Sequence, residues 1–168
     1  MSQLEGGGDR AAYRAVVITC STRAATGVYA DKGGPLVVEA LRQWGFDVGD
    51  PTVVPDGPEV GEALSAALAT QPDLVVTTGG TGLTPTDGTP EATRPLLDRE
   101  VPGIAEAIRA AGVAKGVPTA MLSRGLAGLA GSTLVVNLPG SSGGVRDALA
   151  VLEPVVPHAI SQIRGGDH

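Results

Sequence analysis

Apolar residues follow two different spacings along this chain. Three short runs rich in β-branched residues, at 15–20, 73–80 and 132–140, are typical of strands buried on both faces. Residues 60–70 instead carry apolar side chains at the three- and four-residue spacing of a helix. The same patterns predict helices at 35–44, 90–100, 103–112, 145–152 and 157–163, an interrupted strand at 46–56 and a short strand at 119–125.

Strands that alternate with helices in this way favour parallel pairing with right-handed crossovers. We therefore expect an α/β fold, a three-layer α/β/α sandwich with a mostly parallel central sheet. Residues 13–164 have the length of a single domain, between a disordered leader at 1–12 and a short tail at 165–168.

Composition narrows the class of protein. Apolar residues make up 42% of the chain, enough for a core, but with only four aromatic residues that core must consist of aliphatic side chains. A single cysteine, Cys20, excludes an internal disulfide framework and a multi-cysteine zinc site. The net charge of −6 argues against nucleic acid as a partner, and every apolar run is far shorter than the roughly 20 residues that span a bilayer. We expect a cytoplasmic protein that binds small molecules, with no nucleic-acid or membrane partner.

Glycines gather directly after the predicted strands. Residues 77–93 read TTGGTGLTPTDGTPEAT, where glycines allow positive φ angles and close main-chain approach, and threonines add hydroxyl donors. This make-up is typical of an anion-binding turn, although a purely structural turn would also use glycine. A P-loop would need a lysine after the glycines, and a dinucleotide fingerprint would need glycine where Pro85 stands.

Acidic residues accompany this turn. Glu91 lies at the start of the predicted helix, where it either complements the helix dipole or contacts a nucleotide. Asp87 lies in the loop itself, where a carboxylate would repel a bare phosphate but bind Mg²⁺ carried by one. Asp56 ends the interrupted strand in PDG, where a type I turn would explain an aspartate equally well. If both strands end at the same sheet edge, Asp56 and Asp87 face one cleft, which would suit a metal–nucleotide site.

A second glycine-rich turn, NLPGSSGGVRDAL at 137–149, follows the last predicted strand. Ser141 and Ser142 lead into a helix whose free N–H groups favour an anion. Arg146, one turn in, either assists such an anion or is simply solvated. Two such turns suggest two phosphates from different molecules, or one long ligand.

These motifs together resemble the Mog and MoaB family of molybdenum cofactor biosynthesis, specifically its MogA-type molybdopterin adenylyltransferases. The resemblance rests on TTGGTGLTPTDGTPEAT, DREVPGIAEAIR, LSRGLAG, NLPGSSGGVRDAL, VVPDG and DKGGP, and covers residues 13–164. It implies a homotrimer in which the phosphate of molybdopterin attacks the α-phosphorus of Mg-ATP and pyrophosphate leaves.

The resemblance also implies roles for individual residues. Asp56 and Asp87 match the family's two catalytic aspartates: Asp87 would hold Mg²⁺, and Asp56 would hold the metal or position a substrate. The residues that would contact nucleotide or pterin are Thr78, Gly79, Gly80, Thr81, Gly82, Glu91, Ser123, Arg124, Pro139, Gly140, Ser141 and Ser142.

The sequence departs from many relatives at three positions. Thr22 stands where many relatives have Asp, Gly33 where they have Ser, and Gly88 where Val or Thr is common. None of these changes touches the two aspartates.

Two other functions remain open at this point. One is a MoaB-like, non-catalytic pterin-binding or scaffolding protein, which would need neither aspartate. The other is the pterin-4a-carbinolamine dehydratase label that some relatives carry, a reaction that would want histidines as acid and base. The two histidines, His158 in a closing helix and His168 in the tail, do not suit that role. A partner that inserts molybdenum would act on the product.

Overall fold

The computed structural model describes residues 12–166. Most of the expected leader, residues 1–11, and the end of the expected tail, residues 167–168, lie outside the described residues. Within the described part, no helix has both the length and the apolar content to cross a membrane.

The elements follow one another as strands and helices in near alternation. They are β1 Arg14–Cys20, α1 Thr22–Ala25, α2 Gly33–Gln43, β2 Asp47–Val48, β3 Thr52–Val54, α3 Pro58–Ala69, β4 Leu74–Thr78, α4 Thr89–Thr93, η1 Arg94–Leu96, β5 Arg99–Glu100, α5 Pro102–Ala114, η2 Pro118–Leu122, β6 Ala127–Ala130, β7 Thr133–Leu138, α6 Ser142–Leu152 and α7 Val156–Ile163.

One sheet organises the described chain, in the strand order β2-β1-β4-β7-β6-β5, with β3 also paired to β1. The pairs β1–β2, β1–β3, β1–β4 and β4–β7 are parallel. The interrupted strand expected at 46–56 is confirmed as β2 and β3, which pair with opposite ends of β1. Pro51 lies in the break, where its missing N–H costs no ladder hydrogen bond.

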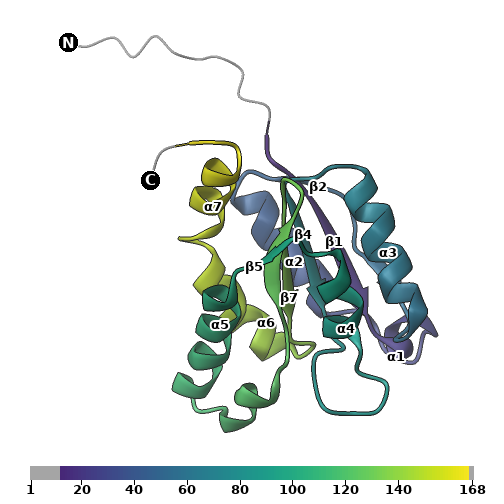
Figure 1. The fold of residues 1–168 in the computed structure, drawn as a ribbon. Coiled ribbons are helices and arrows are strands. Elements are labelled where there is room, and N and C mark those ends of the chain that lie inside the picture. Colours follow the sequence, from purple (N-terminus) through teal and green to yellow (C-terminus); the bar gives the residue numbers. More distant parts are fainter. Residues whose placement is uncertain (1–11, 167–168) are drawn as a thin grey trace.

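Helices cover both faces of the sheet, so the predicted three-layer sandwich is confirmed. Figure 1 shows α5, α6 and α7 on one side of the strands and α3 on the other. Along β4, Leu74 and Val76 point into one core cluster and Val75 into the opposite one. Because both faces are buried, the strand needs a continuous apolar run rather than alternation.

The short strand predicted at 119–125 is wrong. Residues 118–122 form the 3-10 helix η2, and the strand that the sequence did not reveal, β6, follows at Ala127–Ala130. β6 is antiparallel to both neighbours, β7 and β5. Its sequence, AGLA, has little intrinsic strand preference. A Cβ at Gly128 would overlap the carbonyl oxygen of Arg99, so the glycine permits the close approach of β5.

The helix predicted at 90–100 is only partly correct. Helix α4 ends at Thr93, a 3-10 turn follows around Pro95, and the chain then enters β5. Proline cannot continue the helical hydrogen-bond ladder. The Asp98 amide instead donates to the Leu129 carbonyl, 2.7 Å away, which starts the antiparallel pairing.

The strand order places the loops after β1, β3, β4 and β7 at the same edge of the sheet, the carboxyl ends of these parallel strands. The chain leaves β1 through α2 toward β2, whereas α3 carries it from β3 back to β4 on the other side of β1. The sheet therefore has a switch point between β1 and β4, and open α/β sheets bind ligands beside such points, at the carboxyl ends of the strands.

Candidate functional site

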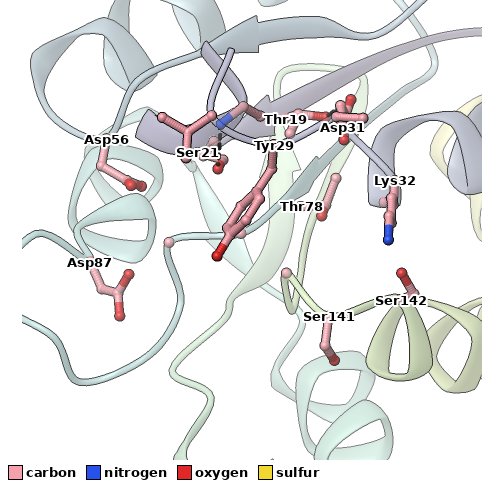
Figure 2. A pocket seen from close by; sticks show the side chains of 18 residues that line it. Thr19, Ser21, Tyr29, Asp31, Lys32, Asp56, Thr78, Asp87, Ser141 and Ser142 are labelled. Atoms are coloured by element: carbon pink, nitrogen blue, oxygen red, sulfur yellow. Dashed lines mark hydrogen bonds between the residues drawn. The ribbon is translucent and has the colours of Figure 1, made fainter. Parts of the chain in front are cut away.

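A cleft of about 680 Å³ opens at this edge of the sheet. Its walls come from the end of β1 and the segment that leads to α2 (within residues 19–33), the end of β4 and the bend after it (residues 78–80) and the turn between β7 and α6 (residues 140–142), together with Asp56 and Asp87. Figure 2 shows the side chains that line this first cleft.

The two glycine-rich turns touch each other. The Gly79 amide donates to the Leu138 carbonyl (3.0 Å), and the Thr78 hydroxyl donates to the Pro139 carbonyl (3.3 Å). A Cβ built on Gly140 would lie 3.2 Å from the Cα of Gly79. The turns therefore form one continuous glycine wall instead of two separate sites.

Gly79 also joins this wall to β1. Its φ of +93° lies in the left-handed region that favours glycine, and a Cβ there would overlap the carbonyl oxygen of Cys20. Gly79 thus allows the bend after β4 to lie directly against the end of β1. This contact closes the base of the cleft.

The two aspartates reach the same cleft from distant parts of the sequence. Asp56 Oδ1 lies 3.1 Å from the Cβ position of Gly80, and Asp87 Oδ2 lies 2.8 Å from that of Gly82. Both residues line the first cleft, at the same end of the view in Figure 2. The geometry required by the sequence hypothesis is therefore present, while the roles of the two carboxylates stay predictions.

Thr22 holds the Asp56 carboxylate. Its amide and its hydroxyl both donate to Asp56 Oδ2, each at 3.3 Å, and the Asp56 amide donates back to the hydroxyl at 3.1 Å. Thr22 supplies donors beside Asp56, where an aspartate would add a second negative charge.

Asp87 closes a turn of its own loop. Its Oδ2 accepts from the Thr84 amide (3.1 Å), and its amide donates to the Thr84 carbonyl (3.0 Å). Residues 83–86 of this loop are exposed. The turn sets the direction of the Asp87 side chain locally, but it does not attach the loop to the sheet.

The other end of the first cleft carries a positive charge that the sequence reading missed. Lys32 lies near Ser142 in Figure 2, and the neighbouring Asp31 accepts from the Thr19 hydroxyl (2.8 Å) and the Gly34 amide (3.1 Å). Ser141 Oγ accepts from the Gly144 amide (3.1 Å) and caps α6. The sequence did contain a signal for Lys32, because its loop follows β1, a strand that ends at the edge of the sheet where the cleft lies.

A second cleft of about 480 Å³ adjoins the first. Its outer wall is formed by α5, η2 and the link between them, where Ile108, Val117 and Leu122 are apolar and Arg109 is charged. It also contains Thr81, Gly82, Ser123, Pro139 and Asp147. The two clefts share Gly80, Asp87, Gly140 and Ser141.

Two predicted contact residues, Glu91 and Arg124, line neither cleft. Glu91 is exposed in the first turn of α4 and forms an ion pair with Arg124, whose hydrogen bond lowers the pKa of the Glu91 carboxyl. Arg124 directs its other donors at main-chain carbonyls of the Asp87 loop. His158 lies on α7, where it hydrogen-bonds Gln162 at 2.9 Å, and it also lines neither cleft.

Cys20 lines the first cleft but is buried. Burial raises the pKa of its thiol from 9.0 to about 11, and the negative charge of Asp56 adds to this effect. The thiol is therefore protonated at neutral pH and a poor nucleophile.

The donor set at the acidic end fits Mg²⁺ bound together with a nucleotide. Among residues 12–166, no group of three or more His, Cys, Asp or Glu side chains could hold a metal ion. Mg²⁺ in nucleotide enzymes is commonly held by one or two carboxylates plus the phosphates of the substrate. Asp56 and Asp87 provide such a pair.

The fold and the clefts define a class: an α/β protein with two joined clefts at the switch point of a mostly parallel sheet, walled by glycine turns and acidic side chains. The family described as a probable molybdopterin binding domain matches residues 16–158, and the chain belongs to this family. The resemblance to Mog and MoaB proteins is thereby confirmed.

Individual relatives cover most of the chain. The structure of the molybdopterin biosynthesis Mog protein from Mycobacterium ulcerans is 55% identical, with a TM-score of 0.86 over 92% of this chain and 98% of that one. A molybdopterin adenylyltransferase from Helicobacter pylori is 37% identical over 153 residues, which are 89% of this chain and 86% of the relative.

A molybdenum cofactor biosynthesis bifunctional protein from Synechococcus elongatus is 41% identical over 155 residues, or 92% of this chain. The match covers 48% of that relative. The chain thus spans about half the length of this longer protein.

Proposed function

We propose that this protein acts in molybdenum cofactor biosynthesis by adenylylating molybdopterin with Mg-ATP, with release of pyrophosphate. One observation carries the proposal: Asp56 and Asp87, from different loops, line the cleft that both glycine turns also line. The names of the Helicobacter pylori and Pyrococcus furiosus relatives, molybdopterin adenylyltransferase, support the same activity.

The reaction suits a site of this composition. A phosphate oxygen of molybdopterin forms a bond to the α-phosphorus of ATP, and the bond from that phosphorus to the bridging oxygen of the leaving pyrophosphate breaks. Such a transfer needs in-line positioning and neutralisation of charge more than a side-chain nucleophile. The buried, protonated Cys20 thiol and the position of His158 outside both clefts are consistent with this requirement.

Each group present has a task in this proposal. Asp56 and Asp87 would hold Mg²⁺, which supplies positive charge to the phosphates when it is bound. The amides of the glycine wall and the start of α6 would donate to phosphate oxygens. Lys32 at the far end of the first cleft would attract a further phosphate group.

The joined clefts explain how two substrates could meet. Gly80, Asp87, Gly140 and Ser141 line both clefts. If each cleft takes one substrate, the two phosphate ends approach each other at this shared wall. The wall is also where an acidic side chain, Asp87, is available to the metal.

The test is direct. Purified protein mixed with molybdopterin and Mg-ATP should release pyrophosphate and form a pterin that carries AMP. Asp87→Asn should remove at least about 99% of turnover while molybdopterin binding persists, since electrostatic groups of this kind contribute about 10²-fold or more. Wild-type protein that binds molybdopterin yet releases no pyrophosphate would instead establish the non-catalytic, pterin-binding alternative.

Other expectations rest on the resemblance alone. These are the homotrimer and a molybdenum-inserting partner, whereas the cytoplasmic location is expected from the single cysteine and the short apolar runs. Light scattering on the purified protein measures the first, and a mass of one chain would contradict it.

A further inference from the structure

The loop that carries Asp87 has few anchors of its own. Residues 83–86 are exposed, with Leu83 at 63% exposure, and within the described chain residues 82–88 belong to neither buried core cluster. The internal hydrogen bonds between Thr84 and Asp87 shape the loop without attaching it to the sheet. Something else must hold the carboxylate in place beside the glycine wall.

Arg124 supplies the attachment. Its Nε donates to the Gly82 carbonyl (2.9 Å), and a terminal nitrogen donates to the Asp87 carbonyl (3.1 Å). The other terminal nitrogen pairs with the Glu91 carboxylate, in the first turn of the helix that follows the loop. One side chain thus ties together the beginning and the end of the loop and the start of α4.

Arg124 is itself fixed to the same turn. Its amide donates to the Thr81 carbonyl (2.8 Å), and the hydroxyl of the preceding Ser123 donates to the Thr81 hydroxyl (3.1 Å). The guanidinium is only partly exposed and lines neither cleft. Its three donating nitrogens meet protein acceptors, so the side chain acts on the loop and not on a ligand.

We propose that Arg124 is a positioning residue that holds the Asp87 carboxylate at the wall shared by the two clefts. This inference rests on the proposed function for its catalytic consequence. The planar guanidinium reaches three acceptors in one fixed arrangement, whereas a lysine ammonium is a single point of charge on a flexible stem. Arg124→Lys therefore keeps the positive charge but loses the simultaneous hydrogen bonds to the Gly82 and Asp87 carbonyls.

Hydrogen exchange of the full-length protein tests whether Arg124 holds the Asp87 loop, without any assay of activity. In Arg124→Lys, the hydrogen-bonded amides of Thr84 and Asp87 in this loop should exchange at least about tenfold faster than in the wild type. Arg94→Lys is the matched control, because Arg94 forms a two-bond pair with Glu100 at 3.0 and 3.1 Å and lines neither cleft. In that control the loop should exchange at the wild-type rate. Equal loop exchange in all three proteins overturns the proposal.

Binding and turnover test the consequence for Asp87. Arg124→Lys should weaken Mg-ATP binding in calorimetry and lower kcat by about 10- to 100-fold, the effect of misplacing a reacting group by about 1 Å. Molybdopterin binding should stay within about twofold of the wild type. A loss of molybdopterin binding as large as the loss of Mg-ATP binding would show general damage and overturn the proposal.

The two proposals fail in different ways. Wild-type protein without pyrophosphate release would refute the transferase function, while loop exchange and Mg-ATP affinity would still decide the role of Arg124. If Arg124→Lys does not fold by circular dichroism, Arg124→Met, which keeps most of the aliphatic stem, takes its place in both measurements.

Discussion

Replacement of Gly79 by alanine tests the close contact on which the cleft is built. At φ +93° an alanine is strained, which costs about 1–2 kcal/mol for a left-handed residue. The new Cβ also overlaps the Cys20 carbonyl oxygen, a main-chain atom that cannot rotate away. Overpacking of this kind adds about 1–3 kcal/mol. We expect Gly79→Ala to lose about 2–5 kcal/mol of unfolding free energy.

Gly45 offers a matched control. Its φ is also +93°, but a Cβ there would meet nothing within 4 Å. Gly45→Ala should therefore lose only the strain of about 1–2 kcal/mol. The difference between the two variants isolates the overlap with Cys20.

Urea unfolding followed by circular dichroism measures both losses, and a thermal scan checks them. For a chain of this length, an extra loss of about 2 kcal/mol lowers the melting temperature by roughly 4–8 °C. Gly79→Ala should also weaken Mg-ATP binding, because the displaced bend belongs to the cleft wall, whereas Gly45→Ala should leave it intact. Equal stability of the two variants would refute the argument that the approach of β4 to Cys20 requires glycine.

Two further predictions concern the same end of the cleft. Thr22→Val removes the hydroxyl that donates to the Asp56 carboxylate and accepts from the Asp56 amide. Turnover in the pyrophosphate assay should fall about fivefold, the equivalent of about 1 kcal/mol, and Thr22→Ser should restore it. Full turnover in Thr22→Val would contradict the role of Thr22 in holding Asp56. Burial raises the pKa of the Cys20 thiol to about 11, so between pH 9 and 11 the thiol ionises in the unfolded chain but not in the folded one. The contribution of the protonated thiol to stability is therefore complete below pH 9 and is lost as the pH rises toward 11. Between pH 8 and 10.5, the unfolding free energy in urea should fall by roughly 2 kcal/mol more in the wild type than in Cys20→Ala, and identical losses would contradict this.

The buried strands could be predicted because local sequence decides them. β1, β4 and β7 are nearly continuous apolar runs, and such runs have few alternatives to a strand buried on both faces. The turns after β4 and β7 could also be predicted, because positive φ angles require glycine at Gly79 and Gly80, and a close contact with Gly79 favours glycine at Gly140. These positions fix the edge of the sheet at which the site lies.

The missed features depend on contacts between distant residues. β6 is strand because Gly128 admits the main chain of β5, which no local preference encodes. Lys32 reaches the cleft because Thr19 and Gly34 bind its neighbour Asp31. Arg124 was expected near the substrates, and its hydrogen bonds to carbonyls of the Asp87 loop, 37 and 42 residues earlier, are contacts that no local pattern encodes. Sequence pattern indicates which residues gather at an edge, and tertiary hydrogen bonds decide which of them face the ligand.

The absence of lysine from the first glycine turn follows from how charge is divided along the cleft. A bare phosphate at the Asp56 and Asp87 end would face two carboxylates, and glycine amides alone would offset their repulsion poorly. A phosphate that carries Mg²⁺ reverses the sign of that interaction. At the other end, Lys32 and the start of α6 would attract an anion without a metal. A lysine beside Asp87 would pair with the carboxylate and compete with the metal for it, so the turn keeps its donors on the main chain and the cation stays at the opposite end.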